Sequence, residues 1–275
     1  MEATQLTAIL SRLAVTRLGV PPDQLAEVLI FVHGFGCDQS LWQWVEPAFR
    51  ANFSTVLYDL AGCGRSDQTA YDFGRYARLE AHSGDLCALI EEVGGGKPVH
   101  LVGHSVGATI AVLAAKKAPA QVASLSLVAP SPRYTDCEGY IGGMSEQQAE
   151  ELLNFLELNH LGWSAAIAPA IMANADKPEL SNTLRESFCR MDPAIAAHFA
   201  RATFLSDHRA DLSVIQTPSL IMQVQSDSIA PTTVGDFMVN SLANSQLDLL
   251  ACEGHCPHVS DPALVITSLN KFLGQ

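Results

Sequence analysis

The chain has 275 residues, of which 48% are hydrophobic and 16% are charged, a composition that provides enough apolar side chains for one α/β domain with a sheet buried on both faces. Its 16 Lys and Arg residues against 29 Asp and Glu residues give a net charge of −13. This acidic balance argues against nucleic acid and against an anionic membrane as partners, because both attract basic surfaces.

The N-terminus, Met1-Glu2-Ala3, lacks the basic segment and apolar core of a signal peptide. No apolar run farther along the chain reaches the ~18 residues of a membrane span. The seven cysteines include no C-x-x-C pair, a pattern that favours reduced thiols. We therefore expect a cytoplasmic, intracellular protein.

The apolar run from Val28 to Val32 predicts a buried strand, and it ends in His33-Gly34-Phe35-Gly36. The glycines on both sides of Phe35 leave its backbone free to turn its N–H inward. If a nucleophile lies nearby, the Phe35 amide is our candidate for one donor of an oxyanion hole. The alternative is a simple glycine-rich turn.

Gly103-His104-Ser105-Val106-Gly107 is a G-x-S-x-G motif between a predicted strand, 99–102, and a predicted helix, 108–118. This context is typical of a nucleophile elbow, a sharp turn that holds a serine in a strained backbone conformation. Side chains at 103 and 107 would collide with the neighbouring strand and helix. Ser105 is therefore the candidate nucleophile and the Val106 amide the second oxyanion donor, with a plain strand-to-helix turn as the alternative.

Residues 131–205 contain no strand pattern and predict a helical insertion. Ser145 and Gln148 form a capping-box signal, and Asp192-Pro193 is typical of a helix start. The predicted helices span residues 145–157, 163–174, 181–191 and 192–203.

The run from Pro218 to Val224 predicts a buried parallel strand, and Asp227 is the only carboxylate in the loop that follows it. In an elbow-type hydrolase the acid follows the serine and precedes the histidine. We therefore choose Asp227 over an ordinary turn aspartate and over Asp211, Asp236 and Asp248, each of which lies in or beside a predicted element.

The apolar residues Leu247, Leu249 and Leu250 predict the last strand, which is followed by Glu253-Gly254-His255-Cys256-Pro257-His258. We choose His255 as the base because Gly254 allows it a tight approach, and we assign His258 to a supporting position behind the base or to helix capping. Cys252, His255 and Cys256 fit no common zinc spacing, and a metal there would occupy the base, so we expect no metal.

Several segments of the sequence resemble one branch of the α/β-hydrolases, the branch of the bacterial stress-response regulator RsbQ and the plant strigolactone and karrikin receptors. The strongest likeness is to RsbQ. The matching segments are 34–40, Tyr58-Asp59, 62–67, 103–107, 131–134, Gly142-Gly143, 206–209, 229–231 and 254–258.

This resemblance implies an α/β-hydrolase fold, a mostly parallel central sheet flanked by helices, with a four-helix V-shaped lid inserted. The core then comprises residues 1–130 and 206–275, and the lid residues 131–205, without a core of its own. The resemblance also implies a triad of Ser105, Asp227 and His255 with the oxyanion hole at Phe35 and Val106.

For the substrate pocket the resemblance implies walls that include Phe35 and the lid residues Trp163 and Phe204. Met144, Ile167 and Thr203 lie at neighbouring positions, and for each lid residue the alternative role is packing within the lid. The implied activity is slow hydrolysis of a small, mainly apolar ester or lactone of butenolide type, without a cofactor. The alternative is a ligand-sensing regulator that binds a signalling partner, phosphatase-like in the case of RsbQ, through its lid. A cofactor-free haloperoxidase or a C–C hydrolase shares the triad and stays open.

Overall fold

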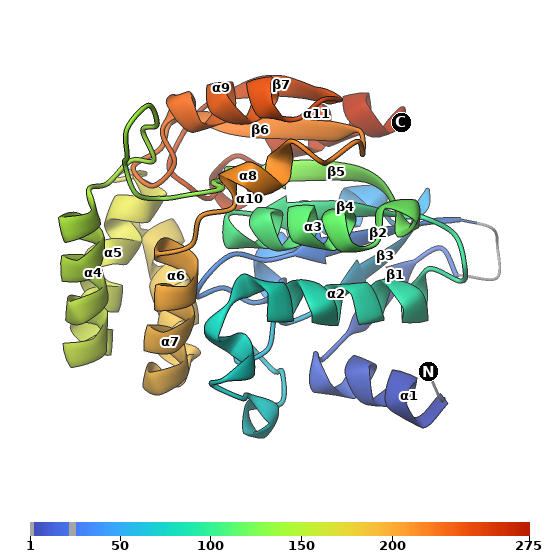
Figure 1. Cartoon of the computed structure of the whole chain (residues 1–275), viewed down its shortest axis with the longest axis horizontal. Coiled ribbons are helices and arrows are strands. Elements are labelled where there is room, and N and C mark those ends of the chain that lie inside the picture. Colours follow the sequence, from blue (N-terminus) through green and yellow to red (C-terminus); the bar gives the residue numbers. More distant parts are fainter. Residues whose placement is uncertain (1–2, 22–25) are drawn as a thin grey trace.

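A seven-stranded sheet in the order β1-β3-β2-β4-β5-β6-β7 runs through the computed structural model, which describes residues 3–21 and 26–275 (Figure 1). β1 pairs antiparallel with β3 at one edge, and all the other neighbouring strands are parallel. The strands are β1 (Thr16–Gly19), β2 (Glu27–Val32), β3 (Phe53–Leu57), β4 (Val99–His104), β5 (Val122–Val128), β6 (Ser219–Ser226) and β7 (Ser245–Glu253).

Helices cover both faces of this sheet. They are α1 (Ala3–Arg12), α2 (Leu79–Val93), α3 (Val106–Lys117), α8 (Arg209–Leu212), α9 (Thr232–Ser241), α10 (Pro257–Ser260) and α11 (Pro262–Leu273). Short 3₁₀ turns span Gln39–Trp42, Glu46–Phe49, Gln68–Ala70, Arg75–Ala77 and Pro119–Gln121. The predicted α/β-hydrolase fold, with a mostly parallel sheet flanked by helices, is thus confirmed.

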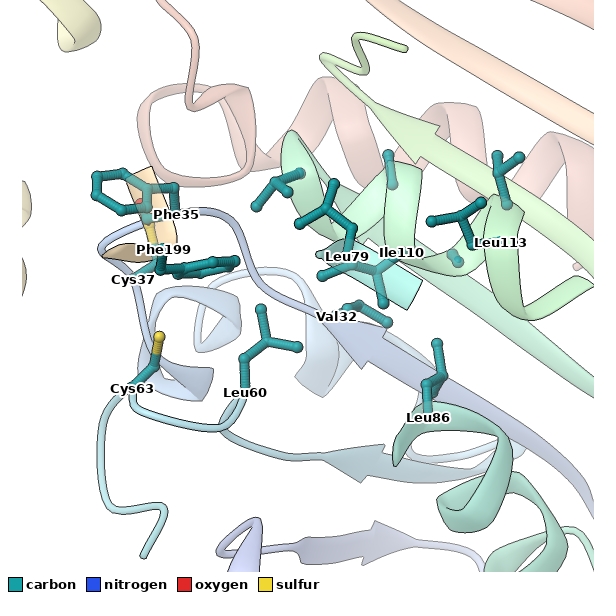
Figure 2. Packing of buried hydrophobic residues seen from close by; sticks show 14 of the residues in the cluster. Val32, Phe35, Cys37, Leu60, Cys63, Leu79, Leu86, Ile110, Leu113 and Phe199 are labelled. Atoms are coloured by element: carbon teal, nitrogen blue, oxygen red, sulfur yellow. The ribbon is translucent and has the colours of Figure 1, made fainter. Parts of the chain in front are cut away.

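The sequence of strand β2 is apolar after its first residue because both of its faces are buried. Alternate side chains of a strand point to opposite faces. Val32 joins the cluster that contains Leu86 of α2 and Ile110 of α3, as Figure 2 shows, whereas Phe31 joins the opposite cluster with Leu269 of α11. Both faces of β2 are buried from solvent, so its sequence is a continuous apolar run and not the alternating pattern of a half-exposed strand.

A helical insertion separates β5 from β6. Its helices are α4 (Glu146–Leu158), α5 (His160–Met172), α6 (Pro178–Arg190) and α7 (Pro193–Phe204). Figure 1 shows them grouped on the left, beyond one end of the strands, while α1 and the C-terminus lie on the right. This insertion is consistent with a lid; its V shape and the bounds 131–205 stay predictions.

The helix starts follow local capping chemistry, and here the sequence-based bounds need correction. Ser145 and Gln148 form the predicted capping box, and Asp192 caps α7. α5 starts at His160 rather than at 163, because the Asn159 side chain caps it, and α6 starts with Pro178 at its first position rather than at 181. α3 starts at Val106, directly after the turn at Ser105, rather than at 108.

Candidate active site

Ser105 lies in the turn between β4 and α3 with a strained backbone, φ 54° and ψ −124°. A Cβ at Gly103 would lie 2.6 Å from the Gly107 carbonyl oxygen, and a Cβ at Gly107 would lie 2.5 Å from the Val32 carbonyl oxygen. Both distances are too short for any side chain. The predicted need for glycine at these two positions is therefore confirmed, and the reason is the close approach of α3 to β4 and β2.

The structure brings Ser105, His255 and Asp227 together in one hydrogen-bonded chain. The Ser105 Oγ lies 2.7 Å from His255 Nε2, and His255 Nδ1 lies 2.7 Å from Asp227 Oδ2. The other carboxylate oxygen accepts hydrogen bonds from the backbone N–H groups of Ile229 and Ala230. The contact joins residues 150 positions apart because parallel strands place their carboxyl ends along one edge of the sheet.

Burial strengthens the hydrogen bonds among Ser105, His255 and Asp227. Ser105 is 6% exposed, His255 is 4% exposed, and the Asp227 side chain is fully buried. A carboxylate can only accept, so His255 Nδ1 donates to Asp227, which leaves Nε2 free to accept from the Ser105 hydroxyl. In a low dielectric these interactions are stronger than in water. The arrangement can therefore take the proton from Ser105 and make it a nucleophile.

His258, the alternative base, has a different environment. Its ring lies 4.6 Å from the Trp42 ring and 4.3 Å from the His104 ring, and the residue is buried within α10, where it caps no helix end. Burial, and then the nearby His255, lowers the pKa of His258 to about 3, so this imidazole is neutral. His104 Nε2 donates to the His255 carbonyl oxygen at 2.8 Å, so His104 supports the backbone of His255 while His258 packs against the His104 ring.

The other carboxylates considered from the sequence lie elsewhere. Asp211 pairs with Lys116 and His208, Asp236 is on the exposed side of α9, and Asp248 bonds to Ser268 on α11. Each belongs to an element rather than to the loop beside the serine.

Tyr134 is a site residue that the sequence reasoning did not single out. Its hydroxyl lies 3.2 Å from Ser105 Oγ, and its ring packs against Phe204. Burial raises the pKa of Tyr134 well above its ordinary value, so the phenol keeps its proton. Because the Ser105 proton goes to His255, the Tyr134 hydroxyl donates to Oγ. The match at residues 131–134 marked this segment but gave Tyr134 no role.

The two proposed oxyanion donors flank the serine. Val106 is the first residue of α3, so its N–H has no partner four residues earlier in the helix. The Phe35 loop lies so close to the elbow that a Cβ at Gly34 would be 3.2 Å from the Ser105 Cβ. Among the turn and loop hydrogen bonds of residues 3–21 and 26–275, none has the Phe35 or the Val106 N–H as its donor. Their role as an oxyanion hole stays a prediction.

A cavity of about 290 Å³ lies directly above Ser105. The six residues expected in the pocket all line it: Phe35, Met144, Trp163, Ile167, Thr203 and Phe204. Other lining residues were not expected, among them Cys37, Gln148, Leu152, Leu184, Phe188, Ser228 and Cys256. Of the described residues, no Asp, Glu, Lys or Arg lines the cavity, so an apolar ligand can bind without burying a charged side chain.

The candidate metal ligands in the site are poorly suited to bind a metal ion. Both ring nitrogens of His255 are engaged by Ser105 and Asp227. Burial raises the pKa of Cys256 and of Cys37, which favours the thiol over the metal-binding thiolate. In the part of the chain that the structure describes, there is no cluster of three His, Cys, Asp or Glu side chains arranged for a metal ion.

Comparison with known proteins places this geometry in a family context. Residues 29–267 match the model of the alpha/beta hydrolase family. A strigolactone esterase from Arabidopsis thaliana is 32% identical, over 90% of this chain and 92% of that protein. A karrikin insensitive 2 receptor from Petunia hybrida is 31% identical, over 90% of this chain and 92% of that protein. These relatives confirm the predicted resemblance to the strigolactone and karrikin receptors.

Among solved structures, a hydrolase from Oleispira antarctica superposes with a TM-score of 0.93 at 33% identity, and the match covers 98% of this chain and 97% of that one. The helices within the described ranges are too short or too polar for any of them to cross a bilayer.

Proposed function

The chain belongs to the alpha/beta hydrolase family, and we propose that it hydrolyses a small, mainly apolar ester or lactone, with Ser105 as nucleophile, His255 as base and Asp227 as the acid that orients the base. The observation that carries this proposal is the unbroken series of hydrogen bonds Ser105–His255–Asp227 beside a mostly apolar cavity.

In the proposed reaction, His255 Nε2 takes the Ser105 proton while Oγ attacks the carbonyl carbon of the ligand. The carbonyl oxygen becomes negative and is stabilised by the N–H groups of Phe35 and Val106. The His255 cation, held by Asp227, then returns the proton to the leaving oxygen. Water releases the acyl group from Ser105 by the same steps in reverse.

The cavity supports the substrate class. A volume of about 290 Å³ suits a compact ligand, and the aromatic side chains of Phe35, Trp163 and Phe204 surround it. We propose that residues 131–205 act as the lid and that Met144, Ile167 and Thr203 complete the substrate contacts. A butenolide-like lactone has the size and polarity that this space favours.

Two measurements test the proposal. A fluorophosphonate probe should attach to Ser105 in the wild type and not in the Ser105→Ala variant, as read by peptide mass spectrometry. The same variant should lose p-nitrophenyl acetate hydrolysis by about 10³-fold or more while keeping its melting temperature. p-Nitrophenyl palmitate should be a far poorer substrate than the acetate. Equal kcat/KM for both esters would argue against a closed pocket.

A second candidate function is ligand sensing, and the identity to a karrikin receptor favours it. In this proposal hydrolysis is slow, and a ligand that contacts both Ser105 and the lid shifts the lid toward a form that a cytoplasmic signalling partner binds. A finer form of this proposal, which rests on the sequence resemblance to RsbQ, is that the partner is phosphatase-like. A pull-down with and without a butenolide tests it; a kcat above about 10² s⁻¹ without a ligand-dependent partner would favour plain ester metabolism.

A further inference from the structure

The loop that carries Phe35 is held by a side chain from the helical insertion. We infer that Ser187, on α6, is a positioning residue for the proposed hydrolysis, because it fixes the loop whose Phe35 amide is a proposed oxyanion donor. This inference rests on the proposed function and adds a residue that does not touch the ligand's reacting atoms.

The carrying observation is one buried hydrogen bond. The Ser187 hydroxyl donates to the Gly36 carbonyl oxygen at 2.8 Å, and Ser187 is only 3% exposed. Gly36 has φ +70°, a conformation that glycine adopts without strain. Within the loop, the Cys37 N–H donates to the Gly34 carbonyl oxygen and the Cys37 thiol donates to the Phe35 carbonyl oxygen. The Gly36 carbonyl oxygen, in contrast, is held from outside the loop by Ser187.

Helix α6 also packs directly on this backbone. A Cβ at Gly36 would lie 2.1 Å from the Phe188 ring, so the ring occupies the space that a side chain would take. Arg190, at the end of α6, donates to the Asp38 carboxylate at 2.7 Å. Three contacts, from Ser187, Phe188 and Arg190, thus connect the last turn of α6 to residues 36–38, and Ser187 makes the one that reaches the backbone by a hydrogen bond.

The neighbouring helix holds the other reactive loop. The N–H of His255 donates to the Ile171 carbonyl oxygen in α5 at 2.8 Å, and Gly254, with φ +86°, lies against the Met172 carbonyl. Trp163 of α5 and Phe188 of α6 pack with their ring centroids 5.1 Å apart. The α5–α6 pair therefore contacts both the loop of the base and the loop of the oxyanion donor, and it sets their separation.

Loss of the Ser187 hydroxyl should act on the transition state alone. The oxyanion forms only after Oγ attacks, so a displaced Phe35 amide weakens the transition state and leaves ground-state binding unchanged. Removal of a whole oxyanion donor costs about 10²–10³-fold in kcat. Because the amide would be displaced rather than removed, we expect a loss of roughly tenfold in kcat with KM within about twofold.

The experiment compares Ser187→Ala with Thr183→Ala, its matched control one turn earlier on α6. The Thr183 hydroxyl bonds only to the Glu179 carbonyl of its own helix. Steady-state hydrolysis of p-nitrophenyl acetate gives kcat and KM, and phenylboronic acid, which forms a tetrahedral adduct on the serine, gives an inhibition constant. For Ser187→Ala we expect kcat and boronate affinity to fall by the same factor; Thr183→Ala should match the wild type. Ser187→Thr, which keeps a hydroxyl, should recover most of kcat.

Arg190→Gln gives a second reading if Ser187→Ala does not fold, because Arg190 is half-exposed and its replacement leaves the core intact. It should show a smaller loss confined to kcat. Wild-type kcat in Ser187→Ala, or a loss confined to KM and melting temperature, would overturn the inference while the proposed function stands. A wild-type protein that neither cleaves the ester nor binds the boronate would overturn the proposed function and this inference with it.

Discussion

Replacing Asp227 by Asn tests the orientation of His255 with a change of very few atoms. In the native site, Asp227 Oδ1 accepts from the Ile229 and Ala230 amides, and Oδ2 accepts from His255 Nδ1. An asparagine has one oxygen and one NH₂ group for these two sides. If its oxygen stays with the two amides, its NH₂ group faces His255 Nδ1, which must then accept.

That exchange puts the imidazole proton on Nε2, where it can no longer take the proton of Ser105. The opposite orientation aims the NH₂ group at two backbone donors and leaves both unsatisfied in a buried place, at about 1–3 kcal/mol for each group. That penalty disfavours the second orientation, although it alone would keep the Nδ1–H tautomer. The first orientation therefore dominates, the base is lost, and kcat should fall by about 10³–10⁴-fold, as is usual when the acid of such a triad becomes an amide.

The assay is kcat/KM for p-nitrophenyl acetate from pH 5 to 9, with circular dichroism to check the fold. Asp236→Asn is the matched control, since Asp236 is exposed on α9, and it should keep wild-type activity. If Asp227→Asn retains more than about a tenth of the activity, or if both variants lose the same amount, the tautomer argument is wrong.

Three further predictions concern other residues. Tyr134→Phe removes the donor to Ser105 Oγ and should lower kcat/KM for the same ester by about fivefold, the worth of one ordinary hydrogen bond; an unchanged value would mean that the 3.2 Å contact contributes nothing. Burial lowers the pKa of His82 to about 3, so the unfolded chain takes up a proton below about pH 6.5 that the folded protein does not, and stability falls as the pH falls. Other buried histidines contribute in the same way, so His82→Phe should reduce the pH dependence by up to about 1.4 kcal/mol per pH unit in urea melts at pH 6.5 and 5. Equal losses of stability in His82→Phe and in the wild type would contradict the cause. Gly107→Ala should cost on the order of 1–3 kcal/mol and most of the activity, because its Cβ would meet the backbone of β2; a stable, active variant would refute the close approach.

The sequence by itself determined four of the strands, β2, β4, β6 and β7, the elbow, and the order of the three proposed reactive residues. These features are local: a strand buried on both faces must be apolar throughout, and a turn as sharp as that at Ser105 admits only glycine at 103 and 107. Since the carboxyl ends of parallel strands lie along one edge of a sheet, the sequence alone predicts that the loops at 227 and 255 lie near Ser105. The choice of His255 over His258 relied on one glycine. Three helix starts were missed by two or three residues: the Asn159 cap of α5, Pro178 at the start of α6, and the start of α3 directly after the turn at Ser105.

Only the tertiary structure decided which residues from distant segments are in contact. Tyr134 reaches Ser105, Ser187 reaches Gly36, and the Ile171 carbonyl accepts from His255, each across tens of residues or more. A sequence pattern indicates that a residue is buried, because burial selects for apolar character, but it does not indicate which neighbour the residue meets. A buried serine or tyrosine has no periodic signature of its own, and its partner is set by how the inserted helices dock on the strand ends.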